Sequence, residues 1–413
     1  AVSAIVERLE RVENGGRAGD PILIQGVTGS GKTEVYLRAA ADALRRGRQV
    51  LMLVPEIALT HQIIQRFESR FPGLIGVYHS DLSENRRIDA WRGGRDGRIR
   101  IVIGTRSAFA VPLPELGLII MDECHDESYS QSEGRPVFSA STLAIDYGRL
   151  TNAAVVYGSA TPSVTQRYKA EQSHWTIVEL PKRVGGAVPP SIQIVDLRNE
   201  LREGNSSLFS RTLEEKLAKT LEAGRQSILF MNRRGLSSYV FCANCGMPFH
   251  CPNCDLNLTL HRATERMVCH VCGHKEDIPR VCPSCGSGEI NRFSAGIEEV
   301  HALTAERFPT ARILRLDSDA AASRDTAAKV LETFAKGDAD ILIGTRMVSK
   351  GLDFPNVALV GVVLAEIGGG LLDYRVEEQI YQLMTQVIGR AGRSDRGGEA
   401  ILQTYQPDRY SIR

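Results

Sequence analysis

The residues with the clearest chemical purpose form a glycine-rich stretch at positions 26–33, which matches the phosphate-binding pattern G-x-x-x-x-G-K-S/T in full. The members of this stretch are Gly26, Val27, Thr28, Gly29, Ser30, Gly31, Lys32 and Thr33. Glycine lets the backbone approach a phosphate closely, and successive N–H groups at the start of a helix form a site for anions. We therefore expect Lys32 to reach the β- and γ-phosphates of a nucleoside triphosphate and the Thr33 hydroxyl to ligate Mg²⁺.

The neighbouring sequence supports this interpretation. An apolar run at 22–24 precedes the stretch, and helical apolar spacing over 34–45 follows it. This is the strand–loop–helix context that the pattern requires. A glycine-rich turn that only resembles the pattern is the alternative, and it would not need that context.

An acidic pair, Asp122 and Glu123, directly follows an apolar strand-like run at 118–121. We expect Asp122 to hold Mg²⁺, directly or through water, and Glu123 to orient and deprotonate an attacking water. Solvated carboxylates at a strand end are the alternative, and the phosphate-binding stretch upstream favours the catalytic interpretation. No redox or transfer motif surrounds the neighbouring Cys124, so we expect it to be a small buried side chain.

Two arginines in the second half of the chain, Arg390 and Arg393, lie three positions apart at the end of a helix predicted over 377–390. This spacing would place both side chains on one helix face. Guanidinium groups there suit a γ-phosphate approached across a cleft, where they would stabilise charge in the transition state. A basic helix end with glycine caps is the alternative.

Eight of the nine cysteines crowd into residues 242–285 as four C-x-x-C pairs. Without a secretion signal, this pattern indicates metal ligation rather than disulfides, and eight thiolates suffice for two tetrahedral Zn²⁺ sites. The spacing leaves the pairing open, because five residues separate Cys245 from Cys251 and fourteen separate Cys254 from Cys269. Four closed thiolates leave no open position for catalysis, so we expect a structural role in which zinc folds a segment too small to build a core.

Apolar strand-like runs alternate with helix-like segments along the chain, which predicts parallel sheets covered on both faces. In the first half we expect strands at 50–54, 74–78, 99–103, 118–121 and 153–157, and helices at 57–71, 84–91 and 139–150. A proline- and glycine-rich hinge follows at 180–190. In the second half we expect strands at 192–195, 227–230, 312–316, 340–343, 357–364 and 400–403, and helices at 211–222, 297–307, 324–334 and 377–390.

The plan is therefore two α/β lobes, the second of which carries the cysteine segment as an insert. One internal repeat supports their equivalence, since Ile-Gly-Thr-Arg ends a predicted strand at 103–106 and again at 343–346. Ligands bind at the carboxyl ends of strands in open α/β sheets, so we expect the two copies to share a role.

Length and composition are those of an ordinary globular protein with 413 residues, 43% of them hydrophobic, and a net charge of +1. No apolar run approaches the roughly 18 residues of a membrane span, so we expect a soluble, cytoplasmic protein with no membrane partner. A nucleic-acid partner would have to be held by local basic patches. The opening helix has no capping residue before Ala1, which suggests a fragment of a longer chain.

Together, these motifs and their order resemble the superfamily 2 helicases, and specifically the bacterial primosomal replication-restart helicase family (PriA). The matching stretches cover nearly the whole chain and lie at 26–36, 53–60, 104–108, 122–125, 158–162, 232–235, 344–351 and 386–393. The resemblance implies two tandem RecA-like lobes at 1–182 and 183–413, with a zinc-binding insertion at 238–290.

The resemblance also implies an activity, namely ATP-driven 3′ to 5′ helicase action on DNA at stalled replication forks and D-loops, in replication restart and primosome assembly. Its implied cofactors are ATP, Mg²⁺ and two Zn²⁺. Its implied partners are single-stranded and forked DNA, primosome and replicative-helicase loading proteins, and single-stranded DNA-binding protein. The zinc insert would then dock DNA or primosome proteins.

Individual roles carry over by position. The resemblance places Thr105, Arg106, Thr345 and Arg346 on the DNA backbone, and Gln386, Arg390 and Arg393 toward ATP. It nests the zinc ligands, with Cys242, Cys245, Cys282 and Cys285 on one ion and Cys251, Cys254, Cys269 and Cys272 on the other. His250, His261, His270 and His274 are then not ligands.

Some features depart from the family pattern or stay open. Cys124 stands where the family usually has Glu, His61 stands where Pro is usual, and residues 138–140 differ from the family's stretch, which bears on DNA coupling. The family's N-terminal DNA-binding parts and C-terminal domain are absent from this sequence. Residues 126–138 match an aromatic-rich coupling loop in which Tyr129 or Phe138 would stack on a base, with a simple surface loop as the alternative.

A second class of function also fits the sequence, namely a zinc-dependent, non-catalytic platform for primosome assembly whose ATP site only sets conformation. An RNA helicase or a chromatin-type translocase would share the two lobes, but the position of the zinc array disfavours both.

Overall fold

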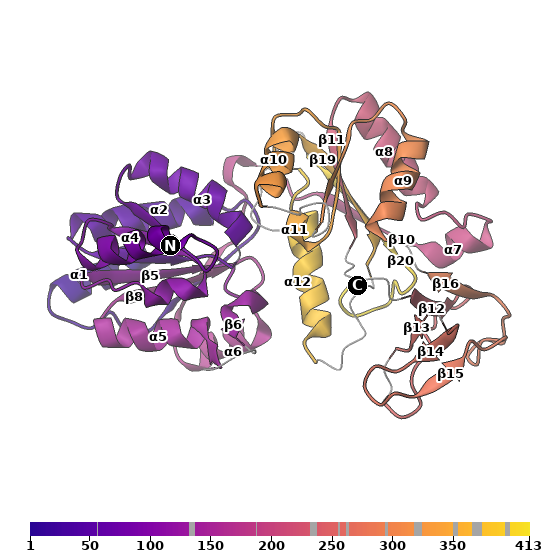
Figure 1. Cartoon of the computed structure of the whole chain (residues 1–413), viewed down its shortest axis with the longest axis horizontal. Helices are drawn as coiled ribbons and strands as arrows, with labels where there is room; N and C mark the ends of the chain where they lie inside the picture. Colours follow the sequence, from indigo (N-terminus) through magenta and orange to yellow (C-terminus); the bar gives the residue numbers. More distant parts are fainter. Residues whose placement is uncertain are drawn as a thin grey trace. The chain divides into compact units, whose positions relative to one another are not determined.

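The computed structural model describes residues 1–55, 57–131, 137–186, 188–231, 238–254, 257–261, 264–293, 296–317, 324–349, 354–365, 374–392 and 397–413. The chain divides into two compact units, Ala1–Gly186 and Ala187–Arg413 (Figure 1). Residues 183–186 pack with the first unit, and the predicted domain limits at 182 and 183 stay a prediction.

The first unit is built on a parallel sheet of seven strands in the order β3-β4-β2-β5-β8-β1-β9. Its strands are β1 (Ile22–Gly26), β2 (Gln49–Leu53), β3 (Ile75–Tyr78), β4 (Ile101–Gly104), β5 (Leu116–Asp122), β8 (Ala154–Ser159) and β9 (Thr176–Leu180). Successive side chains of a strand point to opposite faces, and both faces are apolar here. Ile22 and Ile24 therefore join one buried cluster, whereas Leu23 joins the other.

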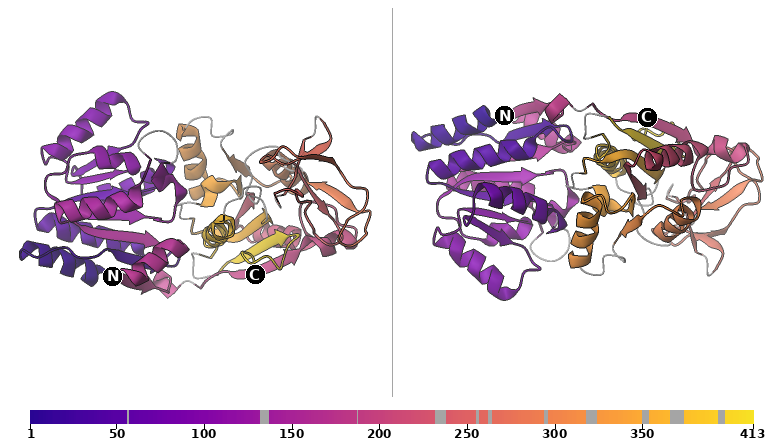
Figure 2. Two further views of the ribbon diagram at one scale, coloured as in Figure 1. Left: turned by 90° about the horizontal axis from the view of Figure 1, so that it is seen from below. Right: turned by 90° about the horizontal axis from the view of Figure 1, so that it is seen from above.

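Helices cover both faces of this sheet (Figure 2). They are α1 (Val2–Glu13), α2 (Lys32–Arg45), α3 (Ile57–Arg70), α4 (Glu84–Arg95), α5 (Ala140–Thr151) and α6 (Val164–Gln172). Short 3₁₀ turns lie at Arg106–Ala110, Glu127–Tyr129 and Val184–Gly186, and a two-stranded ribbon joins β6 (Ser130–Gln131) to β7 (Phe138–Ser139). Because every strand is parallel, all carboxyl ends meet at one edge of the sheet, where the loops that follow β1, β4, β5 and β8 gather.

The second unit has a parallel sheet of six strands in the order β10-β20-β19-β11-β18-β17. These are β10 (Ser191–Asp196), β11 (Gln226–Met231), β17 (Ile313–Leu316), β18 (Ile341–Gly344), β19 (Val357–Leu364) and β20 (Glu399–Thr404). The helices are α7 (Leu197–Arg202), α8 (Arg211–Glu222), α9 (Ile297–Arg307), α10 (Arg324–Ala335), α11 (Arg346–Ser349) and α12 (Val376–Ile388). Two apolar clusters, one on each face of the sheet, form its core.

The cysteine insert is a separate antiparallel sheet in the order β15-β14-β13-β12-β16. Its strands are β12 (Ser238–Cys242), β13 (Thr259–His261), β14 (Arg266–Val268), β15 (Lys275–Asp277) and β16 (Ile290–Phe293). We expected that this segment could not build a core without zinc, and its small apolar cluster includes two of the cysteines. Phe249, Leu258, Leu260 and Met267 are buried in it.

The predicted fold class, two parallel-sheet lobes with a two-site cysteine insert in the second, is confirmed. Strand β9 was not predicted, because it lies in a segment that we read as leading into a hinge, yet it pairs with β1 along its whole length. No helix in the described part of the chain combines the length and apolar character needed to cross a membrane.

Candidate nucleotide site and zinc centres

The phosphate-binding stretch forms the tight connection between β1 and α2. Gly29 and Gly31 have φ angles of 79° and 85°, a left-handed conformation that other residues rarely adopt. A Cβ added to Gly26 would lie 2.5 Å from Ser30 Oγ and 3.2 Å from Lys32 Cγ. Glycine at these positions lets the loop fold back on itself at the start of α2.

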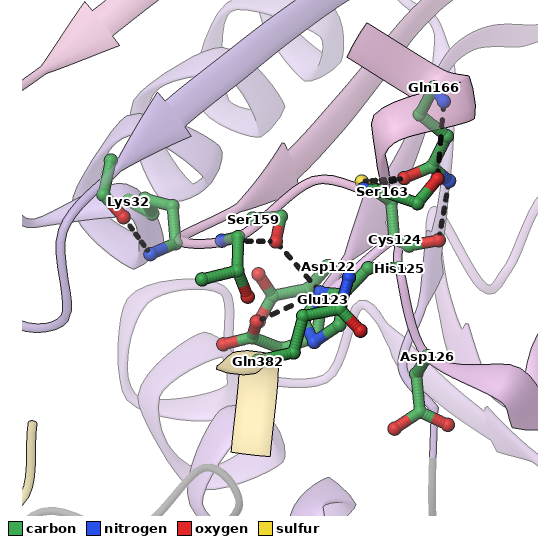
Figure 3. Close-up of polar contacts among 12 residues, drawn as sticks. Lys32, Asp122, Glu123, Cys124, His125, Asp126, Ser159, Ser163, Gln166 and Gln382 are labelled. Carbon is green, nitrogen blue, oxygen red and sulfur yellow. Dashed lines mark hydrogen bonds and ion pairs between the residues drawn. The ribbon is translucent and has the colours of Figure 1, made fainter. Parts of the chain in front are cut away.

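This loop presents donors for an anion. In the described part of the chain, the backbone N–H groups of residues 31–33 donate no backbone hydrogen bond. Lys32 Nζ donates to the carbonyl of Gly26 at 2.8 Å, so the ammonium lies over the loop (Figure 3). The Ser30 hydroxyl oxygen is shielded from solvent without a partner. A set of N–H donors without acceptors, with an ammonium beside it, fits the phosphates of a nucleotide.

The segment after β9 lies against the same loop. The N–H of Val27 donates to Leu180 O at 3.1 Å, and the N–H of Val184 donates to Gly29 O at 3.0 Å. A Cβ on Gly31 would lie 2.9 Å from Val184 Cγ2. Since the first unit ends at Gly186, the chain leaves this unit directly beside the phosphate loop.

Asp122 ends β5 beside this loop and contacts α2. The hydroxyl of Tyr36 donates to Asp122 Oδ1 at 2.9 Å. Burial and the neighbouring Glu123 carboxylate raise the pKa of Asp122 to about 6, although the charge of Lys32 and the Tyr36 hydrogen bond oppose this shift. Burial, followed by Asp122, raises the pKa of the Tyr36 phenol, which therefore stays a donor. Two adjacent carboxylates beside a single ammonium fit a site that is completed by a divalent cation.

Glu123 has two unusual features. Its φ is 46°, a left-handed conformation that costs a non-glycine residue about 1–3 kcal/mol. Its Oε2 atom is buried without a hydrogen-bond partner and lies 3.7 Å from His125 Nδ1. Strain and an unsatisfied carboxylate oxygen typically persist where function requires them, and this oxygen is available to accept a proton from water.

The loop after β8 contacts the acidic segment. Ser159 Oγ and His125 Nδ1 lie 2.7 Å apart, and Ser159 Oγ also accepts the N–H of Thr161 at 2.9 Å (Figure 3). Ser159 is fully buried. His125 therefore links the acidic segment to the loop after β8, so a displacement of one segment would move the other.

Gln166 fixes the chain next to the acidic pair. Its Nε2 donates to Cys124 O at 2.7 Å, and its Oε1 accepts the N–H of Ser163 at 3.1 Å as part of the capping box of α6 (Figure 3). Cys124 is 2% exposed, and burial raises the pKa of its thiol. Cys124 is thus a small buried side chain, as predicted.

The prediction that Tyr129 stacks on a base is wrong for this structure. Tyr129 is 2% exposed, and its hydroxyl donates to the backbone oxygen of Asp122 at 2.7 Å. Arg106 Nη1 donates to Ser128 O at 3.0 Å and to Ser130 O at 2.9 Å, which holds the segment around Tyr129. For Phe138, which is partly exposed on β7, stacking stays a prediction.

The remaining predicted contacts lie at the carboxyl ends of strands or on α12. Thr105 follows β4, and Thr345 follows β18, with Arg346 beginning α11. Gln386 lies on α12 and Arg390 just beyond it, and both are buried. The helix ends at Ile388, so the predicted placement of Arg390 on a helix face is wrong. Arg393 and residues 232–235 lie outside the described residues.

The eight clustered cysteines come together in two nested groups, the arrangement that the resemblance implies. One group is Cys242, Cys245, Cys282 and Cys285, called the outer site below, and the other is Cys251, Cys254, Cys269 and Cys272, called the inner site. The Sγ atoms of Cys242 and Cys285 are 3.6 Å apart, and those of Cys251 and Cys272 are 3.5 Å apart. A tetrahedral Zn²⁺ with bonds of about 2.3 Å separates its sulfurs by about 3.8 Å, so both groups fit zinc.

Three of the four C-x-x-C pairs share one backbone turn. A glycine with φ of 70–75° follows each pair, at Gly246, Gly273 and Gly286. The N–H of each glycine donates to the carbonyl of the first cysteine of its pair. Hydrogen bonds from the backbone of His274 and Ser287 lower the pKa of Cys272 and Cys285, each to about 6. Burial raises the pKa of Cys245, and the hydrogen bond with Cys272 raises the pKa of Cys254, each to about 12. Each group thus combines lowered and raised thiols, and a bound cation would favour the thiolate form of all four.

The two sites differ in what surrounds them. The outer site is fastened to the second lobe, because Arg202 Nη2 donates to Asn244 O at 2.6 Å and the Phe241 ring packs against Tyr405, tilted by 44° with ring centroids 4.2 Å apart. A Cβ on Gly246 would lie 2.4 Å from Tyr405 O. The inner site instead contributes Cys251 and Cys269 to the small core of the insert.

Sequence reasoning missed the side chains that hold the acidic pair. Tyr36 had no assigned role, although its position one helical turn after Lys32 places both on one face of α2. The bond between His125 and Ser159 joins residues 34 positions apart. Local periodicity carries no signal for such a contact.

Comparison with protein families divides the chain in the same way as the structure. A DEAD/DEAH box helicase model matches residues 10–169, and a helicase conserved C-terminal domain model matches residues 286–395. A model of the PriA DNA helicase Cys-rich region matches residues 251–276, which contain the inner site.

Curated relatives that match almost the whole chain point to the same family as the Cys-rich model. Replication restart protein PriA of Bacillus subtilis is 44% identical over 390 residues, which are 94% of this chain and 48% of that protein. The Synechocystis protein of the same name is 44% identical over 396 residues, 94% of this chain and 47% of that protein. The chain spans about half the length of the curated relatives it matches.

Among solved structures, Mycobacterium smegmatis helicase Lhr bound to single-stranded DNA and AMP-PNP has a TM-score of 0.56 with 19% identity, over 97% of this chain and 45% of that one. At this identity the likeness concerns the fold alone. The relatives, together with the two helicase models and the Cys-rich model, establish that the chain belongs to the PriA replication restart family of superfamily 2 helicases.

Proposed function

We propose that this chain is the motor of an ATP-dependent 3′ to 5′ DNA helicase that acts at stalled replication forks and D-loops during replication restart. The observation that carries the proposal is the juxtaposition of a phosphate loop with free N–H donors and an acidic pair whose Glu123 holds a buried, unsatisfied oxygen. Family membership supplies DNA as the substrate class.

In this proposal the first lobe carries the hydrolytic chemistry. The backbone of residues 26–33 and the Lys32 ammonium bind the phosphates, and Thr33 and Asp122 hold Mg²⁺, which supplies charge neutralisation when bound. Glu123 accepts a proton from the attacking water through its unsatisfied oxygen. His125 and Ser159 connect that carboxylate to the loop after β8 and so carry its state toward the bound DNA.

The second lobe completes the proposed cycle. Gln386, Arg390 and Arg393 would contact the nucleotide when the lobes close, and the arginines would stabilise transition-state charge. Thr105, Arg106, Thr345 and Arg346 would hold the DNA backbone in both lobes. Hydroxyl and guanidinium groups suit phosphate contacts that are independent of sequence, as translocation requires.

The two cysteine groups would each hold one Zn²⁺ in a structural role, because four thiolates leave no open position. The insert would then dock DNA or primosome proteins. Replicative-helicase loading proteins and single-stranded DNA-binding protein are the proposed partners, and the cytoplasm is the proposed location.

DNA-stimulated ATP hydrolysis tests the motor. We expect single-stranded DNA to raise the rate of the wild-type protein and Lys32→Ala to abolish both basal and stimulated rates, since it removes the phosphate-binding ammonium. If single-stranded DNA does not raise the rate of ATP hydrolysis by the full-length family protein that carries this core, the motor proposal fails. ATP binding without hydrolysis would favour the non-catalytic assembly platform.

A further inference from the structure

A fully buried tyrosine on α2 reaches the carboxylate of the acidic pair. Tyr36 lies one helical turn after Lys32, has no exposed surface, and donates its hydroxyl to Asp122 Oδ1 at 2.9 Å. A phenylalanine would fill the same apolar space without a hydroxyl to satisfy. Because a buried hydroxyl needs a partner, the choice of tyrosine points to the carboxylate that it meets.

The sheet leaves a gap for this side chain. Gly158 on β8 lies beside Asp122 in the register of β5 and β8 and beside Ile24 of β1. A Cβ there would fall 1.7 Å from the Tyr36 hydroxyl oxygen and 2.8 Å from Cζ. Gly158 is not among the glycines with positive φ, so space rather than backbone conformation requires glycine. Tyr36 and Gly158 therefore depend on each other.

We propose that Tyr36 is a positioning residue for Mg²⁺–ATP, acting through Asp122. Its hydroxyl engages one carboxylate oxygen and leaves the other to face the metal. Because Tyr36 and the loop residues Lys32 and Thr33 share the first turns of α2, the same hydrogen bond fixes the distance between the phosphate loop and the end of β5. This inference rests on the proposed nucleotide site and adds a residue to it.

The test compares Tyr36→Phe with a matched control, Tyr157→Phe. Tyr157 is also buried in the first lobe, and its hydroxyl donates to the backbone carbonyl of Ser141 at 2.5 Å, so both changes remove one phenol hydrogen bond. The readouts are ATP affinity by calorimetry with Mg²⁺ and with EDTA, and the thermal midpoint of unfolding.

We expect Mg²⁺ to tighten ATP binding in the wild-type protein and in Tyr157→Phe, and this gain to shrink about tenfold in Tyr36→Phe, because the lost hydrogen bond is to a charged group. Affinity in EDTA should stay the same in all three proteins. If Tyr36→Phe keeps the wild-type response to Mg²⁺ and loses only as much thermal stability as the control, Tyr36 is merely a core residue and the inference fails. If the wild-type protein itself shows no Mg²⁺-dependent ATP binding, the proposed nucleotide site fails with it.

A double variant makes the test independent of folding. Gly158→Ala should displace the phenol and lower both thermal stability and the response to Mg²⁺. Tyr36→Phe removes the atom that the new methyl group meets most closely, so Tyr36→Phe/Gly158→Ala should recover part of the stability but none of the response to Mg²⁺. A double variant that recovers both, or neither, would overturn the proposed dependence between the two residues.

Discussion

The two lobes of this protein share a scaffold but not a chemistry. The first six strands of the first sheet run β3-β4-β2-β5-β8-β1, and those of the second run β17-β18-β11-β19-β20-β10. In chain order these strands correspond one to one, so β1 matches β10 and β4 matches β18. Only β9 is additional in the first lobe.

Equivalent glutamines anchor both sheets. Gln49 begins β2, and its Nε2 donates to Gly94 O at 2.8 Å and to Ile99 O at 2.9 Å. Gln226 begins the matching β11, and its Nε2 donates to Phe334 O and Ala339 O, each at 2.7 Å. In each lobe the amide bridges the end of one helix to the chain that enters the next strand.

The Ile-Gly-Thr-Arg repeat likewise forms the same turn twice. A Cβ on Gly104 would lie 1.9 Å from Tyr78 O and 2.8 Å from the Cβ of Ala108. On Gly344 it would lie 3.0 Å from Leu316 O and 1.9 Å from a methyl group of Val348. Glycine is needed in both copies because atoms of the edge strand and of the following helix occupy the space that a Cβ would take.

The difference lies in the loops that follow matching strands. After β1 comes the phosphate loop, with two glycines of positive φ, whereas after β10 the chain turns into α7 with Asp196 as its cap. After β2 comes α3, whereas the described chain after β11 resumes in the zinc insert. The scaffold therefore sets where a site can form, and the loops decide what it does.

The largest expected effect is a loss of ATP hydrolysis, which would show that catalysis depends on the loops of the first lobe. Glu123→Gln removes the proton acceptor and keeps the side-chain shape, so we expect kcat to fall by about 10³-fold, or ~4 kcal/mol of activation free energy, with ATP affinity retained. Steady-state ATPase and calorimetric ATP binding measure the two quantities.

Glu115→Gln is the matched control, since it makes the same change just before the opposite end of β5, where Glu115 is exposed and lies 3.6 Å from Arg48. It should leave kcat unchanged. Retained turnover in Glu123→Gln would remove Glu123 from the chemistry and weaken the contrast between the lobes.

The next effect concerns the loops of the second lobe. Cys242→Ser disturbs the outer site, which is hydrogen-bonded to α7 and whose neighbour Phe241 packs against Tyr405. We therefore expect it to lower the stability of the second lobe by about 3 kcal/mol. Cys251→Ser disturbs the inner site, whose neighbours belong to the insert, and should cost that lobe less than about 1 kcal/mol.

Denaturant unfolding followed by circular dichroism, with released zinc measured by a colorimetric chelator, tests this pair. Both variants should release zinc, and the variant of the inner site should keep most of the basal ATPase. Equal destabilisation by the two changes would mean that the insert is a single unit integral to the second lobe.

Smaller and symmetric effects are expected from the shared glutamines. Gln49→Leu and Gln226→Leu each remove two hydrogen bonds to carbonyls of buried residues, which should cost about 2–3 kcal/mol in the lobe that carries the change. The only two tryptophans, Trp91 and Trp175, lie in the first lobe, so tryptophan fluorescence follows that lobe alone. Gln49→Leu should shift the fluorescence transition, whereas Gln226→Leu should shift only the remaining part of the circular dichroism transition. If either variant moves both signals together, the lobes unfold as one cooperative unit.

Elements with a local signature could be predicted from the sequence. Helix α8 and strand β19 have the predicted bounds, because an amphipathic helix capped by Ser210 and an uninterrupted apolar run leave a clear pattern. Helix α9 also has the predicted bounds, although no side chain caps its first turn. Strand β9 could not be predicted, since its residues are only partly buried at the edge of the sheet and lead into a glycine- and proline-rich segment.

The same limit applies to the site. The phosphate loop and the acidic pair each consist of consecutive residues, so both could be predicted from the sequence. The contacts that orient them join Tyr36 to Asp122 and His125 to Ser159, which are far apart in sequence and meet only because β8 lies between β5 and β1. Burial of Tyr129 follows from the same packing, which a search for exposed aromatic residues cannot anticipate.

The smallest expected effect tests whether the repeated turn serves both lobes alike. If Arg106 and Arg346 each contact one DNA phosphate, replacing either by alanine should weaken single-stranded DNA binding by less than about tenfold and reduce the salt slope of log K by about 0.7. Arg98→Ala and Arg312→Ala are the controls, because these arginines precede β4 and β17 at the opposite ends of the strands. Fluorescence anisotropy at several salt concentrations measures the slopes.

The two variants should nevertheless differ in ATP hydrolysis without DNA. Arg106 donates to the carbonyls of Ser128 and Ser130, and the residue between them, Tyr129, donates to the backbone oxygen of Asp122. Arg106→Ala should therefore also lower the rate of ATP hydrolysis without DNA. Arg346 belongs to the lobe without the acidic pair, and its replacement should leave that rate unchanged. Equal salt slopes with unequal rates of DNA-independent hydrolysis would mean that the shared turn contacts DNA in both lobes but influences the acidic pair in only one. Unequal salt slopes would mean that the two copies of the repeat do not contact DNA equivalently.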